Sequence, residues 1–399
     1  MKLTGALSRL ALATAPCVFA APAIAQPSGP RAPLVEEVRL SGVDEEFSTI
    51  DPNFVHVASD GRMLIWDAST SQVLIFSAAG KRIATFGRRG QGPGEFGRTV
   101  TGGWLADTLW IYDVGLRRFT LVGPDNSLLR VQPFQPAAQH AQAAATTLGG
   151  PMVRVTPVSL YHDGMLASVL VRGPQAQGGP SGRPLPSRYV VLSGSGELMR
   201  VVGVPPENGA AIRAPIRPAA APAGAVTFVG ATLPGGGTPP RAETAVAPHG
   251  RRFAFVETNL KRGGGGTFAL TVLRPTGDTV FARTYAFDRI PMSKRVEDSI
   301  VVSLAPELRD SARTRMNGQF SPVTAVVLGL DDSIWLQTHE TAAGVPCTML
   351  DDRGQPVLTV VLPRRTELVQ AKRGMVWAVQ RNTDDVPSVV RYRVAMPGR

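Results

Sequence analysis

Short apolar segments alternate with mostly polar turns along this chain. Six times, an apolar segment leads into a tight turn and then into a second segment that is apolar and often aromatic. These second segments are MLIWDA (63–68), LWIYDV (109–114), MLASVLV (165–171), RFAFVET (252–258), IWLQTH (334–339) and MVWAVQ (375–380). Short runs of this composition between turn signals predict β-strands rather than helices.

A second turn follows in five of the six units and completes the repeat. It reads Ala79-Gly80-Lys81 in the first unit and Asp125-Asn126-Ser127 in the second, with counterparts at 194–196, 276–278 and 352–354. Gly, Asn and Asp recur there because tight hairpin turns need positive φ angles. Each unit therefore predicts four antiparallel strands, which is the blade of a β-propeller.

The last unit lacks one strand, and the N-terminal part of the chain supplies a candidate. The segment VEEVRL (35–40) is predicted to complete this blade, which closes the ring and leaves no open sheet edge. We expect an all-β fold, a six-bladed β-propeller, as a single domain over residues 26–399. Its blades are predicted near 50–98, 99–134, 152–204, 241–287, 320–363 and 366–396 plus the strand 35–40.

The units are unevenly spaced, and the long ones contain insertions. An Ala/Gln/Gly-rich insertion is predicted as a loop at 135–151, and a Pro/Gly loop at 173–187. The segments 205–224 and 234–240 are predicted to be flexible or extended. A helical insertion is predicted near 291–317, where Pro291 suits a helix start and Pro306 breaks the helix. Val296, Ile300 and Leu304 are expected to share its apolar face.

The first 25 residues have the features of a secretory signal peptide. Lys2 and Arg9 precede an apolar run that ends in Ala23-Ile24-Ala25, an A-x-A-like cleavage site. We therefore predict a periplasmic or extracellular protein; a lipoprotein anchored at Cys17 is the alternative. No later apolar run is long enough to span a membrane. Cys347 then remains as the one cysteine, which favours a small core residue over a nucleophile.

The charge balance argues against nucleic acid as a partner. The chain carries 42 Lys and Arg against 31 Asp and Glu, a formal net charge of +11. Its arginines are scattered singly or in pairs, whereas nucleic-acid binding needs a concentrated basic stripe. Weak attraction to an anionic envelope surface remains open.

One glycine-rich stretch, FGRRGQGPGEFG (86–97), contains G-x-G-x-x-G, the spacing of dinucleotide-binding loops. Such a loop leaves a strand and opens a helix. Here a strand precedes it, but the residues after Gly97 are β-branched and glycine-containing, and Pro93 lacks a backbone N–H. We interpret the stretch as a connector between two blades.

Two longer segments carry a family resemblance. LIWDASTSQVLIFSAAGKRIATFGRRGQGPGEF (64–96) and LWIYDVGLRRFTLVGPDNSLLRV (109–131) resemble the bacterial six-bladed β-propeller family related to NHL repeats. The resemblance is specific over residues 50 to 130 and fades from 135 onward. It implies the fold, export in many members, and binding at a propeller face. Some six-bladed relatives are metal-dependent lactonases or lyases, so it does not imply one reaction.

Candidate chemistry is sparse. Of the five histidines, only His56 is expected to face the central channel, since it lies on a predicted inner strand. Asp67 and Asp113 recur at equivalent strand ends, which favours turn closure over catalysis. Polar residues at the leading ends of the inner strands are the candidate ligand-binding set: Asp51, Asn53, Arg98, Thr101, Arg154, Glu243 and Glu367.

These observations predict a secreted binding or scaffold protein that recognises a ligand or partner at one propeller face. No metal, cofactor or catalytic residue is predicted. The alternative is a metal-assisted hydrolase or lyase at the channel mouth, where Asp51, Glu243 and Glu367 would hold Ca²⁺. An apolar channel beside an exposed apolar patch would favour the binding protein, whereas ligands converging from three or more blades would favour the enzyme.

Overall fold

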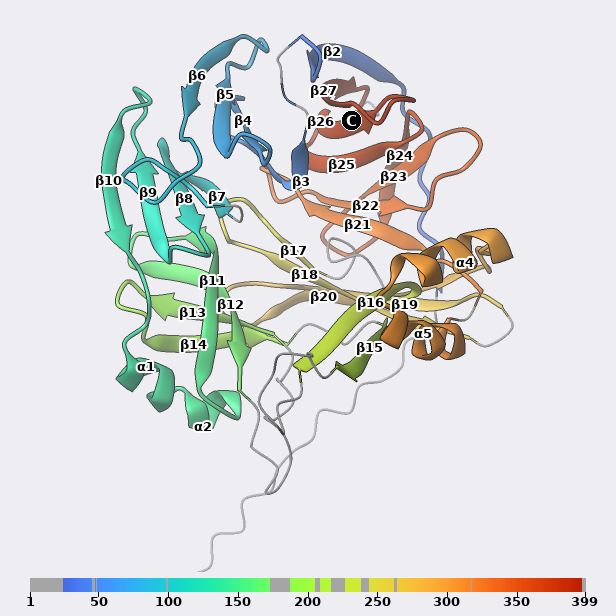
Figure 1. Ribbon diagram of the computed structural model, residues 1–399. Coiled ribbons are helices and arrows are strands. Elements are labelled where there is room, and N and C mark those ends of the chain that lie inside the picture. The colour runs from blue at the N-terminus through green and yellow to red at the C-terminus, as the bar shows by residue number, and fades with distance from the viewer. Residues whose placement is uncertain are drawn as a thin grey trace, which may run out of the picture.

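The structure, a computed structural model, describes most of the chain. The described residues are 24–44, 47, 49–97, 100–172, 187–204, 209–216, 227–237, 244–261, 264–316 and 318–396. Six blades, each with four antiparallel strands, are arranged radially around a common axis (Figure 1). The predicted six-bladed β-propeller is confirmed. Of the predicted signal peptide, only Ile24 and Ala25 are among the described residues.

Each of the first five blades is a consecutive run of four strands. Blade 1 comprises β3 (Ile50–Val57), β4 (Met63–Asp67), β5 (Gln72–Phe76) and β6 (Arg82–Phe86). Blade 2 comprises β7 (Val100–Leu105), β8 (Thr108–Asp113), β9 (Arg118–Val122) and β10 (Leu128–Pro133). Blade 3 comprises β11 (Met152–Leu160), β12 (Gly164–Val171), β13 (Arg188–Ser193) and β14 (Leu198–Gly203). The second turns of blades 1 and 2 contain Gly80 and Asn126, which have φ angles of 85° and 64°, as the repeat predicted.

Blades 4 and 5 follow the same order. Blade 4 comprises β17 (Thr244–Val246), β18 (Phe253–Leu260), β19 (Gly266–Leu273) and β20 (Thr279–Phe287). Blade 5 comprises β21 (Val323–Leu328), β22 (Ile334–Thr338), β23 (Val345–Leu350) and β24 (Pro356–Leu362). Blade 6 joins both parts of the chain: β25 (Thr366–Lys372), β26 (Met375–Arg381), β27 (Pro387–Val394) and β2 (Leu34–Ser41).

The N-terminal segment closes the ring and also follows the outer edges of two earlier blades. β2 pairs antiparallel with β27, from Leu34 opposite Val394 to Ser41 opposite Ser388. Before it, β1 (Ile24–Ala25) pairs parallel with β20, and Arg31 forms a parallel bridge with Thr359 on β24. Residues 24–41 therefore connect blades 4, 5 and 6 along their outer strands.

The hydrophobic core is divided among the six contacts between neighbouring blades. One buried cluster lies between each pair of adjacent blades, including the pair formed by blades 6 and 1. Side chains alternate between the two faces of a strand, so one strand serves two clusters. On β22, Ile334 and Leu336 face blade 4, whereas Trp335 faces blade 6. Burial on both faces explains the continuously apolar second strands that mark the repeat.

The predicted helical insertion is present, but its predicted apolar face is buried only in part: Leu304 packs against the buried cluster, whereas Val296 does not. It contains α4 (Lys294–Ser303), the 3₁₀ turn η1 (Pro306–Leu308) and α5 (Arg309–Arg315). Val301 is buried with Leu308 and Ala312, whereas Val296 is 38% exposed. The prediction treated α4 as one isolated amphipathic helix, whereas the buried face is the one shared with η1 and α5.

Three of the predicted loop segments contain regular structure. The helices in 135–151 correct the expectation of a loop, whereas strands in 205–224 and 234–240 agree with the expectation of extended chain. Residues 135–151 form α1 (Ala138–Ala143) and α2 (Ala145–Leu148), and Leu148 is fully buried in the cluster between blades 2 and 3. Within 205–240, β15 (Gly209–Ile216) and β16 (Thr227–Gly237) form an antiparallel pair that contacts η1. Residues 173–186 lie outside the described part of the chain. No helix among the described residues is long and apolar enough to cross a membrane.

Candidate functional site

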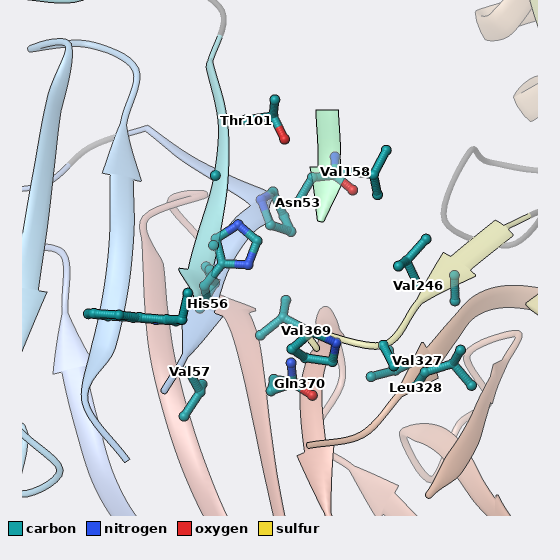
Figure 2. A pocket seen from close by; sticks show the side chains of 18 of the residues that line it. Asn53, His56, Val57, Thr101, Val158, Val246, Val327, Leu328, Val369 and Gln370 are labelled. Carbon is teal, nitrogen blue, oxygen red and sulfur yellow. The ribbon is translucent and has the colours of Figure 1, made fainter. Parts of the chain in front are cut away.

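The first strands of the blades surround a central channel. A cavity of about 240 Å³ lies there, and residues from all six of these strands line it (Figure 2). The described lining side chains are mostly apolar, such as Val57, Val158 and Val369. The polar ones are uncharged or imidazole groups: Asn53, His56, Thr101, Tyr189, Thr244 and Gln370. His56 therefore lies on the channel, as predicted.

Hydrogen bonds hold several of these polar side chains in place. Asp51 Oδ1 accepts from the backbone N–H of Asn53 at 2.8 Å and from its side-chain amide at 2.9 Å. The hydroxyls of Tyr189 and Thr244 lie 3.1 Å apart and bond blade 3 to blade 4. Because these groups are held by the chain itself, the channel has a fixed polar pattern within an apolar wall.

The structure separates the candidate residues at the leading strand ends. Asn53 and Thr101 line the channel, and Asp51 is bonded to Asn53 beside it. Arg154 lines a different cavity, between blades 2 and 3. Glu367 is half-buried on β25 and is not among the channel-lining residues. Arg98 and Glu243 lie outside the described residues, and ligand binding by the predicted set stays a prediction.

No group of three or more His, Cys, Asp or Glu side chains that could hold a metal ion occurs among the described residues. Of the three carboxylates predicted to hold Ca²⁺ under the enzyme alternative, Glu243 lies outside the described residues. In addition, Oδ1 of Asp51 already accepts two hydrogen bonds from Asn53. The two described members of the set, Asp51 and Glu367, therefore do not define a metal site on their own.

The glycine-rich stretch 86–97 is a folded connector between β6 and β7. The backbone N–H of Gly92 donates to Glu95 Oε2 at 2.7 Å, and that of Gly97 donates to Asp113 Oδ2 at 2.6 Å. The Arg118 guanidinium donates to the carbonyls of residues 91, 92 and 95. Since the backbone N–H groups of Gly92 and Gly97 already donate to carboxylates of the chain, they do not form the open phosphate cradle of a dinucleotide site.

The recurring strand-end aspartates close turns, as the repeat indicated. Asp67 Oδ1 accepts from the backbone N–H of Ser69 at 3.0 Å. Asp113 Oδ1 accepts from the N–H of Leu116 at 2.8 Å, in addition to the bond from Gly97. Both carboxylates are buried. Their bonds from Ser69 and Leu116 are the local bonds that a turn requires, whereas the bond from Gly97 ties Asp113 to the connector 86–97.

A larger cavity, of about 570 Å³, lies where the first strands of blades 2, 3 and 4 end. We call it the trailing-face cleft. It is formed by Trp104, Leu105, Ala106, Leu160, Tyr161, His162, Asp163, Val191, Met199, Arg200, His249, Arg251 and Pro275. Met199 is 56% exposed within it. The cleft therefore combines apolar contact area with basic and hydrogen-bonding groups.

The aromatic floor of the trailing-face cleft is held rigidly. Trp104 lines both this cleft and the channel, and the Arg62 guanidinium lies 4.9 Å from the centre of its ring. Asp60 holds Arg62 through a 2.7 Å ion pair. Tyr161 donates its hydroxyl to the carbonyl of Gly250 at 3.0 Å, and burial raises its pKa to about 12. Tyr161 is therefore a neutral, fixed part of the wall.

His249 joins a turn to the cleft. Its Nδ1 accepts from the backbone N–H of Arg251 at 3.2 Å, which confirms the turn role predicted for this position. Its Nε2 lies 3.3 Å from Asp332 Oδ1. Burial lowers the pKa of His249 below its usual value, although the Asp332 carboxylate opposes this effect. The acceptor role of Nδ1 places the proton of the neutral ring on Nε2.

The sequence-based search missed this cleft because it considered the leading ends of the inner strands. The signal was present in the first turns of blades 3 and 4, where His162 and His249 occupy the position that Asp60 holds in blade 1. Both were explained by the turn alone. Trp104 and Met199 carried no separate signal, since apolar residues are expected throughout a strand-rich chain.

Comparison with known proteins supports the architecture. Residues 44–100 match the sequence model of a family described as 6-bladed beta-propeller. No curated protein matches the chain.

Several solved structures are similar in fold at low identity. A Bacteroides fragilis protein, provisionally named as exported, is 11% identical, with a TM-score of 0.45 over 92% of this chain and 96% of that one. Streptogramin B lyase is 12% identical, with a TM-score of 0.40, and the match covers 91% of this chain and 98% of that one. The calcium-binding protein regucalcin from Agrobacterium tumefaciens is 12% identical, with a TM-score of 0.35, and the match covers 94% of this chain and 97% of that one. Similarity at this level carries no argument about activity. From the family match and its own six blades, the chain is identified as a six-bladed β-propeller.

Proposed function

We propose that this chain is an exported binding protein that recognises a ligand at the trailing-face cleft. Export is supported by the apolar N-terminal leader with its A-x-A-like end. Binding is supported by one observation above the others. Turns and strands from three consecutive blades meet in a cavity of about 570 Å³, within the size range of ligand pockets.

The chemistry of the cleft indicates which groups a ligand would present. Trp104 and Met199 offer apolar area, and an exposed methionine adapts to ligands of different shape. Arg200 and Arg251 offer guanidinium donors, while Asp163 is the one carboxylate among the described lining residues. A ligand with an apolar group and a hydrogen-bond-accepting group fits this combination. The rigid ring holds these groups without the cost of ordering loops on binding.

Trp104 provides a direct readout of occupancy. The protein has five tryptophans, and the other four are at most 2% exposed. Acrylamide quenching of tryptophan fluorescence therefore reports mainly on Trp104. We expect a low-molecular-weight fraction of envelope extract to protect Trp104 from quenching in a saturable manner. Trp104→Phe should abolish the quenchable component, which identifies its source.

Two variants separate cleft binding from general surface effects. Met199 and Leu129 are equally exposed, at 56%, but only Met199 lies in the cleft. Met199→Arg is expected to remove the protection, whereas Leu129→Arg should leave it unchanged. Equal behaviour of the two variants would contradict the proposal.

The same experiment distinguishes the enzyme alternative. A ligand that is recovered chemically unchanged after incubation, at a stoichiometry of about one, supports a binding protein. Conversion of the ligand into a product by catalytic amounts of protein would instead support the hydrolase or lyase interpretation.

A further inference from the structure

A third cavity, of about 490 Å³, lies between blades 2 and 3 beside α1. We call it the arginine cavity, because Arg117, Arg154 and Arg172 all line it. Arg117 lies in the turn between β8 and β9, Arg154 on β11, and Arg172 directly after β12. The described residues that line it include none of those that line the channel or the trailing-face cleft. It is therefore a separate candidate site.

The wall of the arginine cavity is aromatic and apolar. Tyr112, Phe134 and Met152 line it, and each is less than 8% exposed to solvent. The rings of Tyr112 and Phe134 lie 6.3 Å apart, with an interplanar angle of 75°. Phe134 is also anchored through its backbone N–H, which donates to the carbonyl of Arg117 at 2.8 Å. The wall is thus preorganised to receive an apolar group.

The three guanidinium groups have no anionic partner among the described residues. No Asp or Glu is among the described residues that line the cavity, and none of the three arginines forms an ion pair with a described carboxylate. Arg117 Nη1 instead donates to a neutral group, the side-chain carbonyl oxygen Oε1 of Gln135, at 2.8 Å. Some other surface arginines do pair with acids, as Arg364 does with Glu340 at 2.7 Å.

Three like charges around one cavity repel each other, and an anion would relieve that repulsion. Guanidinium groups present planar N–H donors that match carboxylate, sulfonate and phosphate oxygens. Beside them, the aromatic wall offers contact area for an apolar body. We propose that the arginine cavity binds a small amphipathic organic anion, with one acidic group on an aromatic or aliphatic body. This inference is independent of the proposed function, since it concerns a different cavity.

A pair of fluorescent probes tests the proposal on the full protein. Anilinonaphthalene sulfonate carries an anionic group, whereas phenylnaphthylamine has the same aromatic body without it. Arg154→Gln is expected to weaken sulfonate binding about tenfold, which corresponds to about 1.4 kcal/mol. It should change phenylnaphthylamine binding much less. Arg172→Gln should act in the same way, and Arg154→Lys, which keeps the charge, should retain part of the affinity.

Controls make every outcome decisive. Arg130→Gln removes an exposed arginine from β10, outside the cavity, and should leave both probes unaffected. Met199→Arg tests whether the probe occupies the trailing-face cleft instead. The proposal is overturned if the wild-type protein shows no saturable sulfonate binding, or if Arg130→Gln weakens it as much as Arg154→Gln does. It is also overturned if only Met199→Arg weakens binding, a result that would support the trailing-face cleft.

Discussion

Closure of the ring by the N-terminal strand can be tested at a single side chain. Leu40 lies on β2, opposite Val389 on β27, and is 2% exposed. It belongs to the cluster between blades 6 and 1, together with Trp377 and Phe47. Leu40→Ala would remove apolar contacts at the seam where the two ends of the chain meet, without altering the backbone pairing of β2.

The expected magnitude follows from this burial. Truncating a fully buried leucine to alanine costs about 2–5 kcal/mol, including the cavity that remains. For a chain of roughly 370 residues, an unfolding entropy of about 2.1 cal/mol/K per residue gives about 0.8 kcal/mol/K. The melting temperature should therefore fall by about 3–6 °C. Val35→Ala, on the same strand at a side chain 49% exposed, should cost less than about 1 kcal/mol.

Thermal melting followed by circular dichroism measures both variants under identical conditions. Deleting residues 26–41 is a stronger perturbation, because it leaves the backbone groups of β27 unpaired at an open sheet edge. Such an edge promotes association between chains, so size-exclusion chromatography should show concentration-dependent oligomers or aggregates.

The reasoning would be refuted by one clear pattern. If Leu40→Ala melted together with Val35→Ala, and the deletion melted as the intact chain does, β2 would not be the strand that closes the ring. A different segment would then have to complete blade 6.

Two further predictions concern partly buried histidines and the glycine-rich connector. Burial lowers the pKa of both His249 and His339 in the folded chain. Near and below the usual histidine pKa of about 6.5, the unfolded chain therefore binds more protons than the folded chain. The free energy of unfolding should keep its full value above that pH and fall as the pH drops below it. His339→Phe keeps an aromatic ring stacked on Phe320 but removes one of the two titrating imidazoles. It should therefore reduce the drop in melting temperature between about pH 7.5 and about pH 5.5. An unchanged drop in melting temperature would contradict this prediction. Gly87 has a φ of 94°, and a Cβ there would lie 2.5 Å from the Phe96 ring, so Gly87→Ala should cost about 1–3 kcal/mol in urea unfolding. Gly94→Ala, at a φ of 74° with its nearest atom 3.5 Å away, should cost less, and equal costs would show that the contact with Phe96 is unimportant.

The blades could be predicted because their signals are local. Turn residues such as Gly80 and Asn126 are needed wherever the chain reverses with positive φ, whatever lies on either side. Apolar runs such as 63–67 are buried on both faces of a blade, so their hydrophobicity is visible in the sequence. The insertions were harder to predict, because tertiary contacts stabilise them. Residues 135–151, which have the composition of a loop, form two short helices. Leu148, at the end of α2, is buried between blades 2 and 3 and stabilises this segment.

The sequence by itself determined the number of blades, the order of their strands and the role of residues 35–40 in closing the ring, because turns, alternation and strand length act over a few residues. Only the tertiary structure decided which distant side chains meet. It placed Asn53 on the channel but Arg154 in a cavity with Arg117 and Arg172, although both had been predicted to share one mouth. The physical reason is that such cavities form where blades pack against each other, and the packing of separate sheets depends on contacts between residues far apart in the chain.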